Sequence, residues 1–273
     1  MEKVGIVGVG AMGSALLERL QLAGVSATAF DIASSAIETA RALGARIAPS
    51  AAAVAQASTL IDVVVRTDQE ILDCALGDNG ILAGAQPGTL VLLHSTIRPE
   101  TTKHVAAAAR AKNVDVIDAC MTAVPRVVRQ GELTFLIGGP ADLVERAKPH
   151  LLNMAKDVIH MGPLGAGNIA KLIKNLVTAS EALIIYEAIQ IGQAGVVSYR
   201  DALEMMRQTR SESTLNRWQD RFDFPGPGLK LKGGANLYDK DIPLAAEVGK
   251  KLGIDIPVTE QLAALGRRLI GVG

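Results

Sequence analysis

Along the first part of the chain, short runs of β-branched and other apolar residues alternate with longer alanine-rich runs. Apolar runs of this length predict strands that are buried on both faces. The predicted strands are Lys3–Val9, Ser26–Phe30, Leu60–Val65, Thr89–His94, Val114–Ala119, Leu133–Ile137 and Val158–Met161. Helices are predicted between most of them, for example at Ala11–Leu22, Ser34–Leu43, Pro99–Lys112 and Ala141–Leu152. The alternation indicates a parallel sheet with helices on each side.

The pattern changes after Gly162-Pro163, where the strand signal ends. Leu172, Leu176, Leu183 and Ile191 then recur at roughly helical spacing, which predicts one helix from residue 167 to residue 194. At about 1.5 Å per residue such a helix spans about 40 Å. We therefore expect an α/β domain over residues 1–163 and an all-helical domain over 164–273, with the long helix within 164–194.

Composition limits the possible partners. A chain of 273 residues, 49% of them hydrophobic, is long enough for two domains. Lys plus Arg and Asp plus Glu both number 28, so the basic excess of a nucleic-acid binder is missing and a small-molecule partner is expected. Cys74 and Cys120 stand far apart without metal-ligand spacing, which argues against a disulfide framework and a metal site. No leader or membrane span is apparent, and we expect a cytoplasmic protein.

A glycine motif follows the first predicted strand and opens the first helix. In Gly8-Val9-Gly10-Ala11-Met12-Gly13, the first glycine suits a tight turn and the second a close approach of pyrophosphate. The third suits close packing of helix on strand, and the helix start offers N–H groups to phosphate. This context predicts a Rossmann-type doubly wound sheet that binds a dinucleotide. The expected contacts are Gly8, Gly10, Ala11, Met12 and Gly13.

Asp31 ends the second predicted strand, where a carboxylate can accept hydrogen bonds from the adenosine ribose. The same carboxylate repels a 2′-phosphate, and the next arginine along the chain is Arg41. NAD is therefore favoured over NADP. FAD uses the same glycine motif, but the residues downstream favour a nicotinamide cofactor.

A second glycine cluster opens the long helix at Gly165-Ala166-Gly167 and precedes Lys171 and Asn175. Residues four apart share one face of a helix. Hydride transfer to a carbonyl leaves an alkoxide that needs a proton, and a lysine can donate or remove that proton. Asn175 offers a donor and an acceptor that can orient the substrate or the lysine. The alternative is that Lys171 and Lys174 are solvated helix charges.

Taken together, these segments resemble the β-hydroxyacid dehydrogenase family, which includes 3-hydroxyisobutyrate dehydrogenase. The resemblance covers essentially the whole chain and rests on several motifs occurring in order. Besides the two glycine clusters they are Ser95-Thr96-Ile97 with Pro99-Glu100, Asp118-Ala119 through Gly131-Glu132-Leu133 to Gly138-Gly139, and Lys240-Asp241-Ile242-Pro243-Leu244-Ala245.

The resemblance implies a role for individual residues. Lys171 is the implied catalytic acid and base, and Asn175 the residue that orients the substrate. Thr96 is implied to touch the cofactor and Lys240 to approach its nicotinamide end, and we count Thr67 with the cofactor-binding residues. The activity implied is hydride transfer between NAD and a small hydroxy acid or its oxo partner.

One departure from the family pattern concerns the substrate carboxylate. Where the family usually has a serine and two glycines, this chain has Thr122-Ala123-Val124. Thr122 keeps a hydroxyl, but Ala123 and Val124 add Cβ atoms where glycine lets a backbone N–H approach a ligand closely. Arg126, or Arg66 at the end of a strand, is a candidate for a bidentate carboxylate contact instead.

Two other functions remain open at this point. An imine reductase has a similar fold, although the resemblance implies that such enzymes typically lack the lysine. A non-catalytic dinucleotide sensor would bind the cofactor and be indifferent to loss of Lys171. For the dehydrogenase, the nearly all-apolar run at Leu183–Ile191 predicts a homodimer through the helical domain. His94 is interpreted as a hydrogen-bonded structural residue rather than a catalytic one.

Overall fold

A computed structural model describes residues 2–194, 197–209, 222–223, 230–231, 237–251, 253 and 257–269 of the chain. The chain divides into two compact units, Met1–Lys171 and Leu172–Gly273. This division falls inside the long helix α9 (Ala166–Ala194), so the domain boundary expected after residue 163 stays a prediction.

The first unit is built around an eight-stranded sheet in the order β3-β2-β1-β4-β5-β6-β7-β8. Chain order runs outward from β1 in one direction and then, from β4, in the other, which makes the gap between β1 and β4 the switch point of the sheet. The strands are β1 (Val4–Val7), β2 (Ala27–Phe30), β3 (Arg46–Ile47), β4 (Leu60–Val63), β5 (Leu90–Leu93), β6 (Asp115–Met121), β7 (Thr134–Gly138) and β8 (Asp157–Gly162).

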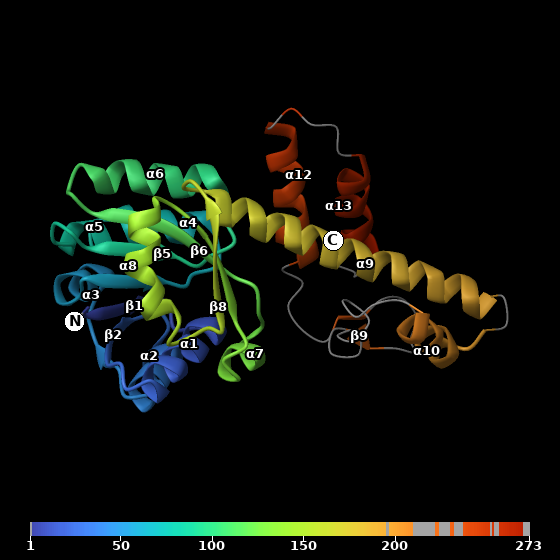
Figure 1. The fold of residues 1–273 in the computed structure, drawn as a ribbon, viewed down its shortest axis with the longest axis horizontal. Coiled ribbons are helices and arrows are strands. Elements are labelled where there is room, and N and C mark those ends of the chain that lie inside the picture. Colours follow the sequence, from blue (N-terminus) through green and yellow to red (C-terminus); the bar gives the residue numbers. More distant parts are fainter. Residues whose placement is uncertain are drawn as a thin grey trace. The chain divides into compact units, whose positions relative to one another are not determined.

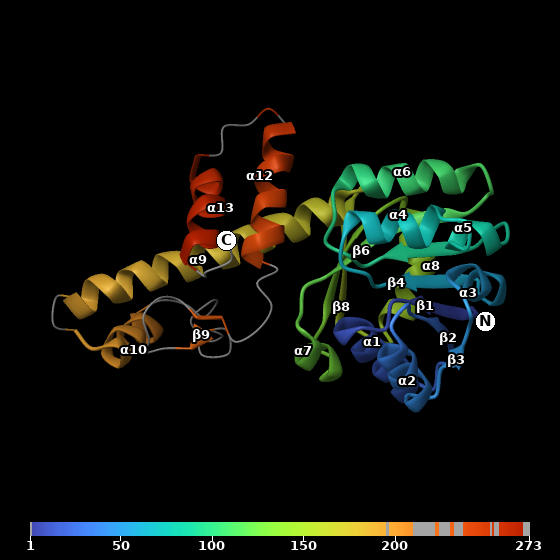
Figure 2. The same cartoon turned by 180° about the vertical axis from the view of Figure 1, so that it is seen from behind.

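Helices cover both faces of this sheet (Figures 1 and 2). One core joins the sheet to α1, α2, α7 and α8 through residues such as Leu16 and Leu151, and the other joins it to α3–α6 through residues such as Val54 and Val105. The predicted doubly wound arrangement is therefore confirmed. The helices are α1 (Ala11–Leu22), α2 (Ser34–Ala42), α3 (Ala51–Ala57), α4 (Asp68–Leu76), α5 (Ile81–Gly84), α6 (Pro99–Arg110), α7 (Pro125–Arg129) and α8 (Ala141–Leu151).

The sheet differs from the expected parallel one at β7, which runs antiparallel to β6. The two strands are joined through α7, a helix of five residues. A parallel connection has to run back along the whole sheet, whereas antiparallel neighbours need no such crossover. The longer α8 then allows β8 to pair parallel with β7.

In its described residues the second unit is helical, as predicted, with one short addition. It contains most of α9, then α10 (Tyr199–Thr209), the π-helical turn η2 (Leu237–Asp241), α12 (Ile242–Lys251) and α13 (Pro257–Leu269). The addition is an antiparallel pair of two-residue strands, β9 (Phe222–Asp223) and β10 (Lys230–Leu231). Among the described residues, no helix combines the length and hydropathy that crossing a bilayer requires.

Candidate active site

The carboxyl ends of five parallel strands lie along one edge of the first unit's sheet. β1, β2, β4, β5 and β6 pair in parallel, so the residues that follow each of them emerge at the same edge. That edge at the switch point is where open α/β sheets bind ligands. The residues that follow these strands there are the Gly8–Gly13 turn, Asp31, Arg66-Thr67, Ser95-Thr96 and Thr122-Ala123-Val124.

The glycine turn has the geometry of a dinucleotide cradle. Gly8 has a φ of +91°, and a Cβ there would lie 2.4 Å from the carbonyl oxygen of Val64. A Cβ on Gly13 would lie 2.0 Å from the oxygen of Gly8, whereas one on Gly10 would meet nothing within 4 Å. No described side chain caps the start of α1, and its first turn has no acidic residue. Open space at Gly10 and uncapped N–H groups fit a pyrophosphate.

Asp31 lies directly against this turn. Its Oδ2 accepts the N–H of Val9 at 2.6 Å, and its Oδ1 accepts the N–H of Ala33 at 2.8 Å. Each carboxylate oxygen can accept a second bond, so the group still has capacity for ribose hydroxyls. The negative charge is thus held beside the glycine turn.

The neighbouring strand ends contribute Thr67 and Thr96. The Thr67 hydroxyl accepts the N–H of Glu70 at 3.1 Å and caps α4, so its backbone is fixed at this edge. Thr96 is half-buried directly after β5, and the adjacent Ser95 donates to the Val65 carbonyl at 2.5 Å. Both threonines therefore lie at the same edge of the sheet as the glycine turn, and their contact with the cofactor stays a prediction.

The hydroxyl of the loop after β6 is engaged within the fold. Thr122 Oγ1 donates to the Thr134 carbonyl at 2.9 Å, and in this arrangement it has no second proton to donate to a substrate carboxylate. Ala123 packs against the core, and Val124 is 46% exposed. Arg126 lies exposed in the first turn of α7, where its Nη1 is 3.4 Å from Gln130 Oε1.

The start of α9 is attached to β6 through Asp118, which is fully buried. Its Oδ1 accepts the N–H of Gly165 at 2.7 Å, and its Oδ2 accepts the N–H of Asn168 at 2.8 Å. Burial raises the pKa of the Asp118 carboxyl to about 6, although the backbone N–H groups oppose the rise. Lys171 follows three residues after Asn168 and is half-buried.

Within the second unit, Asn175 and Lys240 meet the same acid. The Asn175 amide is buried and donates to Asp241 Oδ2 at 2.7 Å. Lys240 Nζ lies 3.5 Å from Asp241 Oδ1. Asp241 thus holds both residues that the sequence predicts for this unit.

His94 has a structural environment, as predicted. Its Nδ1 lies 2.7 Å from the Ala119 carbonyl, and its Nε2 lies 2.8 Å from Asp62 Oδ1. The second oxygen of Asp62 lies 2.8 Å from His150 Nε2. Burial alone would raise the pKa of Asp62, but the two histidines hold it below its usual range. Burial alone would lower the pKa of His150, but the Asp62 carboxylate raises it.

Family models match the chain in two stretches. A model described as the NAD binding domain of 6-phosphogluconate dehydrogenase matches residues 3–162, which is more than half of the chain. A model described as the NAD-binding part of NADP-dependent 3-hydroxyisobutyrate dehydrogenase matches residues 165–271. The chain belongs to the β-hydroxyacid dehydrogenase family.

Individual relatives agree with this membership. An NAD-dependent L-serine dehydrogenase from Pseudomonas aeruginosa is 30% identical over 279 residues, covering 100% of this chain and 94% of that protein. A solved 3-hydroxyisobutyrate dehydrogenase from Mycobacterium tuberculosis, described with L-serine, has the same fold: its TM-score is 0.86 at 24% identity, over 98% of this chain and 93% of that one. This family member is an NAD-dependent dehydrogenase that acts on the CH–OH group of a small molecule.

Imine reductases share the fold as well. One from Myxococcus stipitatus, solved with NADP⁺, has a TM-score of 0.71 at 19% identity, over 99% of this chain and 95% of that one. At that identity the likeness concerns the fold alone. The 30% identical serine dehydrogenase therefore favours hydroxyl chemistry for this β-hydroxyacid dehydrogenase.

Sequence reasoning missed the two buried acids that hold the helix α9. Asp118 lies 47 and 50 residues from its partners, and Asp241 lies 66 residues from Asn175. A signal was present in both cases. Asp118 interrupts an apolar strand, and Asp241 follows Lys240 in a family motif. A buried acid needs a partner, which makes such positions worth testing from sequence alone.

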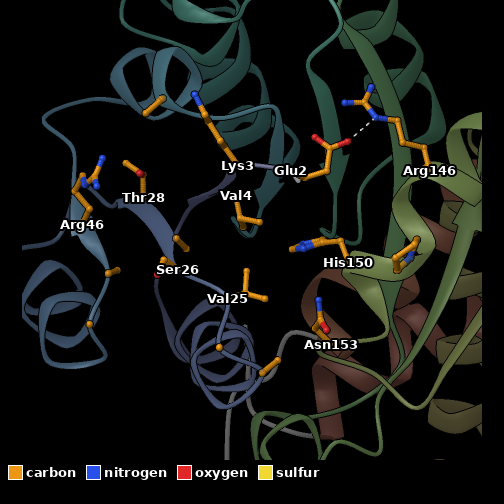
Figure 3. Close-up of a pocket in the computed structure, with 17 residues that line it drawn as sticks. Glu2, Lys3, Val4, Val25, Ser26, Thr28, Arg46, Arg146, His150 and Asn153 are labelled. Carbon is orange, nitrogen blue, oxygen red and sulfur yellow. Dashed lines mark hydrogen bonds and ion pairs between the residues drawn. The ribbon is translucent and has the colours of Figure 1, made fainter.

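This dehydrogenase has a further large cavity, whose lining residues are drawn in Figure 3. Its volume is about 960 Å³, and its lining includes Lys3, Arg46 and His150. Because Lys3 and Val4 stand at the amino end of β1, the cavity opens at the edge opposite the glycine turn. It is therefore separate from the place where NAD would bind.

Proposed function

We propose that this β-hydroxyacid dehydrogenase oxidises a small hydroxy acid, or reduces its oxo partner, with Lys171 as the general acid and base. NAD, when bound, supplies the hydride acceptor, and its reduced form the donor. The observation that carries the proposal is the attachment of the start of α9 to β6 through Asp118.

The start of α9 is attached to β6 close to the carboxyl end of that strand. The N–H groups of Gly165 and Asn168 both contact Asp118, and the Asn168 side chain reaches Cys120, with 3.4 Å between Nδ2 and Sγ. Cys120 stands two residues before Thr122, which follows the end of β6. Lys171 comes about 4.5 Å further along the helix than Asn168. This attachment supports a position for Lys171 close to the edge where the glycine turn lies.

Lys171 and Asn175 would divide the work of handling the substrate oxygen. In reduction the Lys171 ammonium donates a proton to the developing alkoxide, and in oxidation its amine removes the hydroxyl proton. One amide hydrogen of Asn175 is already donated to Asp241. Because that bond fixes the amide plane, the Asn175 oxygen and its second hydrogen are oriented to meet the substrate or the lysine.

The substrate class we propose is a small 3-hydroxy acid such as L-serine or 3-hydroxyisobutyrate, the compounds named in the two relatives. The Thr122 hydroxyl is engaged with Thr134, so the carboxylate needs another partner. Arg126 is our first candidate, because it is exposed and stands two residues beyond that loop. Arg66, exposed after β4, is the second.

We further propose a cytoplasmic homodimer that forms through α9. Ile173 and Val177 lie one turn apart on this helix and are 58% and 54% exposed. Paired apolar side chains on one helix face favour a covering partner. Most side chains of the apolar run at 183–191 lie outside the described residues.

The decisive experiment replaces Lys171 with alanine and follows NADH absorbance with L-serine, 3-hydroxyisobutyrate and a cyclic imine. We expect kcat to fall by about 10²–10⁴-fold with the NAD dissociation constant nearly unchanged. Lys174→Ala, three residues further along the helix, is the matched control and should keep kcat. Normal turnover in Lys171→Ala would end the lysine assignment, and NAD binding without turnover of any hydroxy acid by the wild type would favour the sensor. Turnover of the imine alone would favour the imine reductase.

Replacing Arg126 with alanine tests the carboxylate contact. Loss of a charge-assisted pair of about 1.5–3 kcal/mol should raise the Michaelis constant for the hydroxy acid about 10- to 150-fold and leave the NAD affinity intact. Arg129→Ala is the control from the same helix, because Arg129 already pairs with Glu18. An unchanged Michaelis constant in Arg126→Ala would remove this residue from the site and direct the test to Arg66.

A further inference from the structure

Asp118 supplies the cap of a helix that begins far away in the sequence. The first N–H groups of a helix lack partners within it, and a nearby acidic side chain can accept them. Here the acid belongs to β6, and its two oxygens accept from Gly165 and Asn168 at 2.7 and 2.8 Å. A negative charge at this end of a helix is also favoured by the helix dipole. The position of α9 is thereby tied to one carboxylate.

Two glycines let the helix approach this carboxylate closely. A Cβ on Gly138 would lie 2.5 Å from Asp118 Oδ1, and a Cβ on Gly167 would lie 2.6 Å from Oδ2 and 2.5 Å from the Leu136 carbonyl. Real Cβ atoms do not come this close to an oxygen, so each position excludes a side chain. The sequence therefore keeps space for direct contact between the α9 backbone and the acid.

The side chain of Asn168 adds a second attachment. Its Oδ1 accepts the Thr102 hydroxyl from α6 at 2.8 Å, and its Nδ2 lies 3.4 Å from Cys120 Sγ on β6. All three of these residues are fully buried, and such bonds are retained because a buried polar group without a partner is costly. The start of α9 is thus fixed to both β6 and α6.

We propose that Asp118 is a positioning residue for the reaction: by fixing the start of α9 on β6, it sets where the Lys171 ammonium meets the substrate oxygen. This inference rests on the proposed function of Lys171. Lys171 lies less than one helical turn after Asn168, so a shift of the helix start is passed on to it almost undiminished. A misplacement of about 1 Å at a reacting group can cost about 10²-fold in rate.

The test uses Asp118→Asn, which keeps the shape of the side chain but replaces one acceptor oxygen with an NH₂ group. We expect kcat with the best hydroxy acid of the screen to fall about 10- to 100-fold, with the NAD dissociation constant within twofold of wild type. Asp115→Asn is the matched control, because Asp115 is a half-buried acid on the same strand and should keep kcat. Melting temperature is measured on every variant.

Two further readouts separate positioning from a merely structural role. Combining Asp118→Asn with Lys171→Ala should give the kcat of Lys171→Ala alone, because a residue that acts through the lysine has no effect once the lysine is gone. In the pH profile of kcat, the ionisation that Lys171 contributes should shift in Asp118→Asn and stay in Asp115→Asn. This second readout needs no residual turnover from the double variant.

Several results would overturn the inference. The first is a folded Asp118→Asn variant with kcat within twofold of wild type. The second is a double variant whose kcat is lower than that of Lys171→Ala by the same factor by which Asp118→Asn alone lowers kcat. The third is an Asp118→Asn variant with a lower kcat but an unchanged pH profile. If Lys171→Ala itself turns over normally, the proposed role of the lysine fails first. If Lys171→Ala is inactive while Asp118→Asn is normal, the positioning role alone is refuted.

Discussion

The buried triad His94–Asp62–His150 allows a quantitative stability prediction. Asp62 has no exposed surface, and each of its oxygens meets a histidine Nε2 at 2.8 Å. Asp62→Ala removes both acceptors and leaves the Nε2 atoms of two buried imidazoles without that partner. Breaking a buried pair in this way costs about 3–5 kcal/mol. At about 2–4 °C per kcal/mol for a domain of this size, the melting temperature should fall by roughly 6–20 °C.

Asp62→Asn should lower the stability much less than Asp62→Ala. Its amide oxygen can accept the N–H of His150, and its NH₂ group can donate to His94 Nε2, because the His94 Nδ1 hydrogen is directed at the Ala119 carbonyl. The three hydrogen bonds then survive without the ionic contribution. We expect a loss of about 1–3 kcal/mol, measured by thermal denaturation. Asp78→Asn, an exposed acid in a loop, is the control and should be neutral.

The pH dependence of this difference follows from the two shifted pKa values. The pKa of Asp62 is lowered from its ordinary 3.8. Its contribution to the free energy of unfolding is therefore present above pH 3.8 and is lost as the pH falls through the lowered pKa. The pKa of His150 is raised from 6.5, so its contribution is complete below 6.5 and is lost as the pH rises through the raised value. The advantage of wild type over Asp62→Asn should therefore be largest between about pH 4 and 6.5.

Either of two measurements would refute this reasoning. If Asp62→Asn and Asp62→Ala lose the same stability, the hydrogen bonds of the amide do not replace those of the acid. If the gap between wild type and Asp62→Asn grows above pH 7, the raised pKa of His150 has been assigned the wrong sign.

Two further predictions concern the cofactor end. Gly10→Ala should keep the melting temperature but weaken NAD binding, because its Cβ enters the open space where pyrophosphate fits. Gly13→Ala should lower both the melting temperature and the NAD affinity, because its Cβ would lie 2.0 Å from the Gly8 oxygen. Thermal denaturation and NAD titration measure these effects, and equal losses in the two variants would contradict the pyrophosphate cradle. Asp31→Asn should weaken NAD binding about tenfold or more and reduce the preference of the enzyme for NAD over NADP, because the charge that attracts ribose hydroxyls and repels a 2′-phosphate is lost. An unchanged ratio of the NAD and NADP affinities would contradict this role of Asp31.

Most of the fold could be predicted because strands and helices in this chain have a strong local pattern. The apolar runs that predict β1 and β6 and the helical spacing from residue 167 onward are local properties of the sequence. The direction of β7 is not local, since a strand has the same period whichever way it runs. It depends on the short connection through α7. The length of that connection indicates an antiparallel β7 only when the strand order of the sheet is already known.

The cofactor side of the site has a stronger local signal in the sequence than the substrate side. Gly8, Gly10, Gly13 and Asp31 form a motif whose parts are fixed by one strand, one turn and one helix. The Thr122 hydroxyl can donate to a substrate carboxylate or to a backbone carbonyl, and it donates to the Thr134 carbonyl on β7. The sequence does not show that β7 lies beside Thr122. Long-range partners decide such positions, and periodicity contains no information about them.

The two buried acids of the first unit illustrate how the kind of partner decides the effect of a charge. Asp62 faces two imidazoles that can carry positive charge, whereas Asp118 faces backbone N–H groups, and burial raises its pKa from 3.8 to about 6. The folded chain therefore holds the Asp118 proton more tightly than the unfolded chain, so the carboxylate lowers stability as the pH rises from about 4 to 6, by up to about 3 kcal/mol. Asp118→Asn has no such charge, and its melting temperature relative to wild type should be higher at pH 8 than at pH 5. If Asp118→Asn has a lower kcat than wild type, yet its stability relative to wild type increases with rising pH, this acid is retained for catalysis rather than for folding. If the variant instead loses stability relative to wild type as the pH rises, the helix N–H groups outweigh burial and the carboxylate stabilises the fold.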